Sequence, residues 1–249
     1  MMEIRPLTGI GEIVGGDDLS LILAEPLKPL RPCSGDVLVV TQKIVSKAEG
    51  RMVALDAVTP GARALEIARL TQKDPAFVEV VLSESVEVVR TAPNVLITRH
   101  RLGFVMANAG IDCSNVGPGG QNRALLLPAD PDASAAHLQA ALHQRLGVRL
   151  GIIISDTFGR PWRNGVINVA LGAAGIPSLY DKRGSKDRDG RTLQVTQIAY
   201  GDLLACAAGL MMGEAEEGIP AALIRGCTLP KQDIPAANLV RSLDEDLFR

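Results

Sequence analysis

Short apolar runs separated by polar and glycine-rich stretches predict several buried strands along the chain. The clearest are Val37–Val40, "NVLITRH" at residues 94–100, "VRLGIIISD" at 148–156 and "PAALIRG" at 220–226. "VEVVR" at 86–90 predicts another strand, followed by a turn at Pro93 and Asn94. Each run is about the length of an ordinary strand, so the pattern predicts a sheet-containing core.

Helical spacing of apolar positions predicts helices in three segments, residues 62–72, 130–147 and 200–218. In the second segment, Asp132 or Ser134 is a start signal and Gly147 a stop signal. Strands and helices intermix without a strict βαβ alternation. The sequence therefore predicts an α+β fold with mixed sheets and packed helices.

Two predicted strands run directly into acid and amide groups. Residues 148–156 end on Asp156 and Thr157, and Asp112 and Asn115 follow the short apolar strand in "LGFVMANAGIDCSN". Hard divalent cations such as Mg²⁺ and Mn²⁺ prefer oxygen ligands, often one or two carboxylates with a hydroxyl and substrate phosphate oxygens. The strand ends therefore suggest a metal site.

Each of these residues also has a structural interpretation. An Asp after a strand often caps a turn. Arg160 and Arg163 suit bidentate binding of phosphate or carboxylate, and equally an ion pair with a nearby acid. Lys47 could neutralise phosphate charge or belong to a solvated helix face. Spacing alone leaves these alternatives open.

Charge and composition exclude several classes of protein. The net charge is −2, from 26 scattered basic and 28 acidic residues, and only 3% of residues are aromatic, so we expect no nucleic-acid partner. The 4 cysteines form no CxxC pair. Neither a signal peptide nor an apolar run of about 18 residues is present, so we expect a cytoplasmic protein that does not bind or cross a membrane.

Familiar nucleotide and nucleophile motifs are missing. The sequence has no GxxxxGK[ST], no GxGxxG after a strand and no GxSxG, and "GPGGQ" at residues 117–121 is too short to replace a phosphate loop. The 3 histidines are not spaced for a shared catalytic role. Metal-assisted chemistry on a phosphate is the better interpretation.

Four sequence blocks resemble one family. They are "TQKIVSKAEGR" at 41–51, "NAGIDCSNVGPGG" at 108–120, "ISDTFGRPWRNGVINVALGAAGI" at 154–176 and "MGEAEEGIPAALIRG" at 212–226. In this order, and over about Ile10 to Gly226, the chain resembles the coenzyme F420-0:L-glutamate ligase family, also called F420 gamma-glutamyl ligase.

The resemblance implies a GTP-dependent enzyme that adds L-glutamate to the deazaflavin coenzyme F420-0 and extends a gamma-linked poly-glutamate tail. Phosphoryl transfer from GTP would give an acyl phosphate, which the amine of glutamate attacks. The resemblance further implies Mg²⁺ or Mn²⁺, K⁺, an unusual α+β fold and a homodimer. Residues 1–249 would form a single ligase domain, with room for two intertwined α+β subdomains and without the C-terminal reductase-like domain of some relatives.

The resemblance also assigns roles to individual residues. The implied metal ligands are Asp112, Asp156, Thr157 and Glu214, and the implied catalytic residues are Asp112, Asp156, Arg160 and Arg163. The implied nucleotide contacts are Ile10, Gly11, Glu12, Ile13, Gln42, Lys47, Asn115, Met212, Gly213, Glu214, Ala215, Glu216, Glu217, Gly218 and Ile219. Gly11 and Gln42 stand where relatives usually carry proline and serine, and Glu214 where some members carry glutamine.

Two other hypotheses remain at this stage. The same site could ligate an amino acid to another phosphorylated carboxylate, or the protein could be a non-catalytic regulator that binds GTP and metal. Acceptor-dependent release of GDP separates a ligase from a regulator, and the mass of the product identifies the acceptor.

Overall fold

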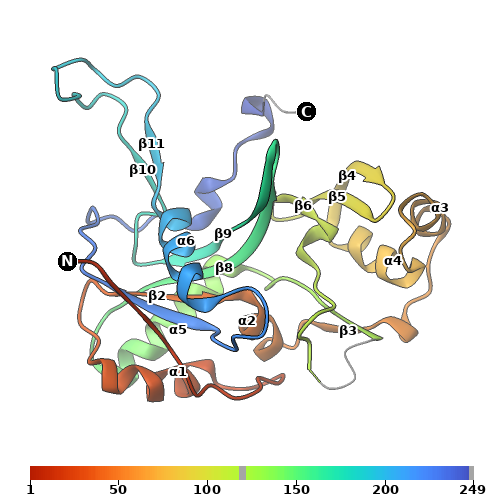
Figure 1. Ribbon diagram of the computed structural model, residues 1–249, viewed down its shortest axis with the longest axis horizontal. Helices are drawn as coiled ribbons and strands as arrows, with labels where there is room; N and C mark the ends of the chain where they lie inside the picture. The colour runs from red at the N-terminus through yellow and green to blue at the C-terminus, as the bar shows by residue number, and fades with distance from the viewer. Residues whose placement is uncertain (118–121, 247–249) are drawn as a thin grey trace.

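The computed structural model describes residues 1–117 and 122–246 (Figure 1). Residues 118–121 of the "GPGGQ" segment and residues 247–249 of the tail lie outside the described residues. The helices are α1 (Leu19–Leu27), α2 (Gln42–Ala48), α3 (Ala62–Thr71), α4 (Pro75–Ser83), α5 (Pro131–Leu146) and α6 (Tyr200–Met212). The strands are β1 (Glu3–Pro6), β2 (Val37–Thr41), β3 (Met52–Ala54), β4 (Ser85–Ala92), β5 (Val95–His100), β6 (Val105–Ala107), β7 (Arg123–Leu125), β8 (Gly151–Arg160), β9 (Arg163–Ala174), β10 (Leu179–Asp181), β11 (Gln197–Ala199) and β12 (Ala221–Arg225). The mixture of helices with several sheets confirms the predicted α+β class.

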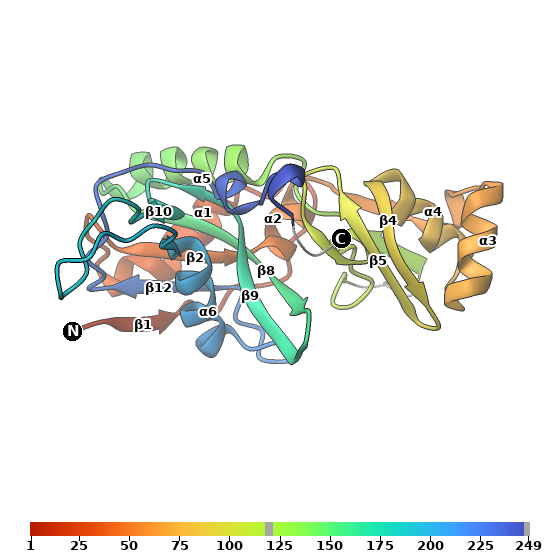
Figure 2. The same cartoon turned by 90° about the horizontal axis from the view of Figure 1, so that it is seen from above.

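A five-stranded sheet in the order β1-β12-β2-β8-β9 forms the centre of the larger lobe. β2 and β8 are parallel, and the other neighbours are antiparallel. Because side chains alternate along a strand, Leu38 and Val40 pack with α1, α2 and α5, whereas Val37 and Val39 pack with α6. Figure 2 shows α5 and α6 on opposite faces of the sheet. Burial on both faces explains why β2 reads as a continuous apolar run.

The smaller lobe comprises residues 52–117 and 122–127 and lies beside one end of the large sheet (Figure 2). It contains the β4-β5-β6 sheet, the β3-β7 pair and helices α3 and α4. Ile67, Val78, Val81 and Leu96 contribute to its own hydrophobic cluster. The predicted turn between β4 and β5 is confirmed, and Asn94 adopts φ 63°, a left-handed conformation that asparagine tolerates well.

Two predicted helix boundaries need correction. α5 begins at Pro131, because Asp130 is the N-cap and its carboxylate accepts the Ala133 N–H at 3.0 Å. Asp132 instead accepts the N–H of Ala173 at 2.7 Å. α6 ends at Met212, so the segment that follows it is a loop and not helix. Within the described residues, no helix combines the length and apolar character needed to cross a membrane.

The prediction that a strand ends at Asp156 is wrong. β8 continues to Arg160 and turns at Pro161 and Trp162 into β9, which pairs with it along its whole length. The outer half of this hairpin leaves the core and projects toward β6 (Figure 1). A register shift between Ile154 and Ser155 marks the transition, and such bulges often lie beside active sites. Backbone pairing therefore carries the polar cluster beyond the apolar core.

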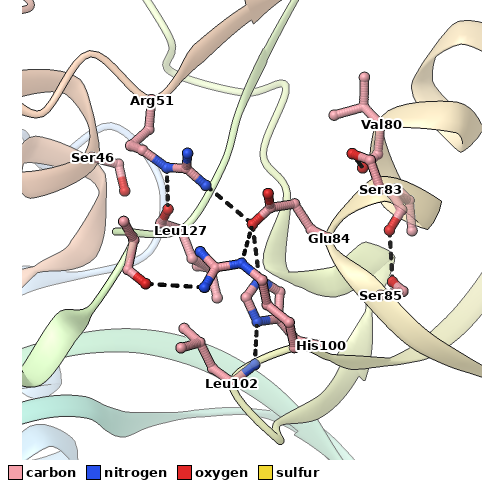
Figure 3. Close-up of polar contacts among 12 residues, drawn as sticks. Ser46, Arg51, Val80, Ser83, Glu84, Ser85, His100, Leu102 and Leu127 are labelled. Carbon is pink, nitrogen blue, oxygen red and sulfur yellow. Dashed lines mark hydrogen bonds and ion pairs between the residues drawn. The ribbon is translucent and has the colours of Figure 1, made fainter.

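The carboxylate of Glu84 connects the two lobes (Figure 3). Its Oε2 accepts Arg51 Nη2 at 3.0 Å and Arg101 Nε at 3.2 Å, and it lies 3.3 Å from His100 Nε2. Arg51 also donates from Nε to the carbonyl of Leu127 at 2.9 Å. These contacts fix the position of the smaller lobe beside α2 and β8.

Candidate active site

The carboxyl ends of β2 and β8 lie at one edge of the large sheet. The two strands are parallel, and Thr41 pairs with Ser155. α2 therefore begins at Gln42 beside Asp156, the next residue of β8. Asp112 reaches the same region from the smaller lobe, where its backbone pairs with that of Leu125. The fold thus brings together the two acidic clusters that the sequence analysis singled out.

A cavity of about 540 Å³ lies between the β8–β9 hairpin and the smaller lobe. The hairpin contributes Asp156, Thr157, Phe158, Gly159, Arg160 and Pro161, and the smaller lobe contributes Ile97, Val105, Met106, Ala107, Asn108, Gly110, Ile111 and Asp112. We call it the interlobe cavity. Its lining combines apolar walls with a few polar groups, which is typical of a small-molecule site.

Three carboxylates shape the electrostatics beside the cavity. Burial, reinforced by the negative charge of Asp112 and more weakly by that of Glu214, raises the pKa of Asp156 to about 7. Lys43 opposes this effect; its Nζ lies 3.2 Å from Asp112 Oδ2 and donates to the carbonyl of Ser114 at 3.0 Å. The raised pKa of Asp156 therefore reflects burial first and neighbouring negative charge second, and a bound cation would favour the charged carboxylate.

The oxygen atoms of these side chains fit a divalent cation whose remaining ligands come from a substrate and from water. Within residues 1–117 and 122–246, no three His, Cys, Asp or Glu side chains lie close enough to hold a metal by themselves. Asp112, Asp156 and the hydroxyl of Thr157 nevertheless supply the one or two carboxylates and the neutral oxygen with which Mg²⁺ combines phosphates and waters. Glu214 is bound to Asn168, whose Nδ2 donates to Glu214 Oε1 at 3.1 Å beside Thr157 in the β8–β9 pairing.

The segments assigned to nucleotide contact also meet at this edge. Lys47, which is buried on α2, forms an ion pair with Glu12. Asn115 Nδ2 donates to the carbonyl of Ala215 at 3.5 Å, joining the loop after β6 to the loop after α6. Gln42 Nε2 donates to Asp112 Oδ2 at 3.4 Å. Segments that are far apart in the sequence therefore form one continuous surface around Asp112.

Not every residue of those segments presents its side chain to the site. Ile13 and Met212 are buried in the two hydrophobic clusters that cover opposite faces of the large sheet, and Ile10 and Ile219 pack against the same clusters. Only the backbone at Ile13 and Met212 is left to contact a nucleotide. The apolar positions therefore anchor the loops, and the polar positions between them face outward.

In the loop after α6, backbone N–H groups donate hydrogen bonds to the carboxylate of Glu217. Glu217 Oε2 accepts the Ala215 N–H at 2.8 Å, and backbone hydrogen bonds from Ala215, Glu217 and Glu214 lower the pKa of the Glu217 carboxyl. Gly213 permits this turn because its φ is 72° and a Cβ would lie 2.2 Å from Glu217 Cδ. Successive N–H groups of this kind form concavities that suit anions.

The structure separates the two predicted catalytic arginines. Arg160 lines the interlobe cavity, whereas Arg163 is exposed on the opposite strand of the hairpin and does not contribute to that lining. Sequence reasoning missed Asn108 and the ion pair of Lys43 with Asp112 as parts of the site. The signal for Asn108 was its position at the start of "NAGID", within the loop of acid and amide groups.

The matching family model defines the class of protein. The model described as F420-0:Gamma-glutamyl ligase matches residues 9–226, and the chain belongs to this family. The sequence is 44% identical over 252 residues to the coenzyme F420:L-glutamate ligase of Methanopyrus kandleri, covering 100% of this chain and 98% of the relative. It is 42% identical over 252 residues to the enzyme of that name from Methanothermobacter thermautotrophicus, covering 100% and 97% of the two chains. The enzyme of that name from Methanocaldococcus jannaschii is 40% identical over 235 residues, covering 94% of this chain and 92% of its own.

Proposed function

We propose that the protein is a GTP-dependent ligase that adds L-glutamate to coenzyme F420-0 and extends the gamma-linked poly-glutamate tail. Family membership and relatives of matching length support the ligase activity. The observation that carries the proposal is the convergence of Asp112, Asp156 and Thr157 on one cavity, beside the surface formed by Lys47 and Asn115. We further propose that it acts as a homodimer and uses K⁺ in addition to a divalent cation.

The proposed reaction begins with transfer of the terminal phosphoryl group of GTP to the acceptor carboxylate. A carboxylate oxygen forms the new bond to phosphorus, the bond to the bridging oxygen breaks, and GDP leaves. The amine of L-glutamate then attacks the acyl phosphate, releasing phosphate and a proton as the amide forms. Positioning and charge neutralisation supply most of the catalysis in such transfers, so no protein nucleophile is required.

The residues of the site have distinct proposed roles in this reaction. Asp112, Asp156 and Thr157 would hold Mg²⁺ or Mn²⁺, which when bound neutralises charge on the nucleotide phosphates. Lys47 is buried at its base and paired with an exposed acid, so its ammonium can turn to a phosphate when Glu12 moves aside. The N–H groups around Glu217 offer a second position for anionic oxygen.

The proposal is tested by incubating the protein with GTP, Mn²⁺ and L-glutamate, with and without coenzyme F420-0. We expect GDP release that depends on the acceptor, and a product heavier by one or more glutamyl residues by mass spectrometry. Asp156→Asn should remain folded and lower turnover at least about 100-fold, because it weakens charge neutralisation without changing side-chain size. Full activity in a folded Asp156→Asn protein would remove this residue from the site.

Two outcomes would favour the other hypotheses. GDP release with a different phosphorylated carboxylate, and none with coenzyme F420-0, would change the acceptor and keep the ligase chemistry. Tight GTP binding without release of GDP for any acceptor would favour a regulator. The size of the cavity and the carboxylates of Asp112 and Asp156 in its lining favour catalysis over regulation.

A further inference from the structure

Two polar atoms at the interlobe cavity lack hydrogen-bond partners. In the described part of the chain, four buried side-chain atoms are unpartnered: Thr98 Oγ1, His100 Nε2, Asn108 Oδ1 and Arg160 Nε. Only the last two belong to residues that line this cavity. One is an acceptor and the other a charged donor. Since a buried group without a partner costs about 1–3 kcal/mol, their joint presence at one cavity needs an explanation.

The two residues face the cavity from opposite lobes. Asn108 lies in the smaller lobe directly after β6, and Arg160 is the last residue of β8. The guanidinium makes one contact within the hairpin, from Nη2 to the carbonyl of Asn164 at 3.3 Å, and no ion pair. Its charge is therefore not matched by a carboxylate of the described chain. A ligand that brings a carboxylate would match it.

The backbone next to Asn108 is strained at Ala109, which adopts a left-handed conformation that alanine disfavours. Asn108, Ala109 and Gly110 have φ values of 53°, 53° and 69°, so three successive residues are left-handed. Ala109 is fully buried and has no side-chain hydrogen bond that would favour this conformation. Such strain persists where surrounding structure fixes it, often at ligand sites. Here it lies in the segment that contributes Asn108 to the cavity lining.

We propose that the interlobe cavity binds the incoming amino acid, with Arg160 taking its α-carboxylate and Asn108 Oδ1 accepting from its amine. The inference rests on the proposed function and specifies which residues would select its amino-acid substrate. A carboxylate and an amine on one carbon are the two groups that a donor and an acceptor on facing walls can hold together. Both atoms are buried, so each side chain must turn slightly to reach the ligand.

This arrangement would also place the amine for reaction. Asp156 and Thr157 lie on the same strand as Arg160, and Asp112 follows Asn108 by four residues. An amino acid held between Arg160 and Asn108 would therefore lie next to Asp112 and Asp156, the carboxylates proposed to hold the cation. Such orientation of two reactants makes a large contribution to the rate of bimolecular reactions.

Two substitutions test the assignment with little change to the fold. Asn108→Gly removes the amide and suits the left-handed backbone, and Arg160→Lys keeps the charge but loses the Nε donor and the planar fork. We expect each to raise the KM for L-glutamate about 10- to 100-fold, the usual effect of losing a hydrogen bond to a charged group. The KM values for GTP and the acceptor should change less than about twofold. Asn108→Asp retains an acceptor and should restore the low KM.

Matched controls separate this role from a general loss of packing. Asn94→Gly makes the same change at a left-handed asparagine in the exposed β4–β5 turn, and Thr98→Val removes an unpartnered hydroxyl outside the cavity lining. Both should leave the KM for L-glutamate unchanged. An increase in the KM of the acceptor or of GTP alone, in either cavity variant, would assign the cavity to that ligand and overturn the proposal.

Calorimetry of L-glutamate binding tests the amino-acid site without requiring the proposed ligase activity. Binding of L-glutamate to the wild-type protein is measured with Mn²⁺, with and without GTP, and no turnover is needed. Wild-type binding that is at least about tenfold tighter than in Asn108→Gly and Arg160→Lys supports the amino-acid site even if no ligation is found. Equal affinity in all three proteins, or no binding by the wild type, overturns it.

Discussion

Two polar clusters beside the smaller lobe differ in how their charges are matched. In the first, Glu84 is shared by Arg51 and Arg101 and lies next to His100 (Figure 3). In the second, at the interlobe cavity, Asp112 and Asp156 repel one another while Arg160 lacks a carboxylate partner. The charges of Glu84, Arg51 and Arg101 are matched within the chain, whereas the charge of Arg160 is not matched by a carboxylate of the described residues.

The difference indicates different roles for similar residue types. When a carboxylate pairs with two arginines, removing one of these partners lowers the stability of the folded protein. The Glu84 cluster is therefore suited to holding the lobes together. A buried carboxylate with a raised pKa, near an unpartnered donor, lowers the stability of the folded protein and is suited to binding a ligand. The clusters should therefore respond in opposite directions when a carboxylate is replaced by its amide.

The largest effect should come from Glu84→Gln. The substitution leaves Arg51 and Arg101 without a carboxylate in a site where Glu84 is 14% exposed. We expect a loss of about 2–3 kcal/mol in the free energy of unfolding, measured by urea denaturation. Glu87→Gln is the matched control, because Glu87 pairs with Arg99 but is 52% exposed, and should cost less than about 1 kcal/mol. Similar losses in both variants would contradict the structural role of Glu84.

Asp156→Asn should change the free energy of unfolding in the opposite direction, toward greater stability. The pKa of Asp156 is raised from 3.8 to about 7 on folding, so the folded protein binds this proton more tightly than the unfolded chain does. Wild-type stability therefore falls as the pH rises from about 4 to about 7, and the amide variant escapes this loss. Without added metal, we expect Asp156→Asn to be more stable than the wild type by about 2 kcal/mol at pH 8, with a smaller gain at pH 5.

Two controls sharpen the Asp156 experiment. Asp189→Asn, in an exposed turn, should not change the melting temperature at either pH. Added Mn²⁺ should stabilise the wild type more than Asp156→Asn, because binding to the folded state alone stabilises by mass action. If Asp156→Asn is less stable than the wild type at pH 8, the Asp156 carboxylate forms a stabilising interaction in the folded protein, which contradicts this prediction.

The sequence predicts the elements of the large sheet better than the shape of its hairpin. β2, β5 and β12 follow from their apolar runs because most of their residues are buried, and α5 follows from helical spacing of its buried positions and from its end signals. The continuation of β8 past Asp156 could not be seen, because those residues are polar and are held by pairing with β9. The turn also lacks its usual signal, since Trp162 and not glycine occupies the left-handed position, with φ 58°.

The candidate site was predictable where residue chemistry was sufficient. Asp112, Asp156 and Thr157 were selected as oxygen ligands after strands, and the structure places them on one cavity. Arg160 and Arg163 looked equivalent in sequence, but in the structure Arg160 lines the cavity and Arg163 is exposed. Asn108 and Glu84 owe their roles to tertiary neighbours, which no local pattern encodes.

A smaller effect should appear in the acid range at His100. Its Nδ1 accepts the Leu102 N–H at 3.0 Å, so the proton of the neutral ring lies on Nε2, and burial lowers the pKa of His100 from 6.5 to about 4 against the opposing charge of Glu84. A depressed histidine pKa contributes stability above pH 6.5 that is lost as the pH falls toward 4, because the unfolded chain binds the proton first. His100→Gln cannot bind that proton, so its unfolding free energy should decline less steeply than that of the wild type between pH 6.5 and 4, by about 1–2 kcal/mol over the range. The exposed His137→Gln is the matched control, and an unchanged slope in His100→Gln would mean that the pKa of His100 is not lowered in the folded protein.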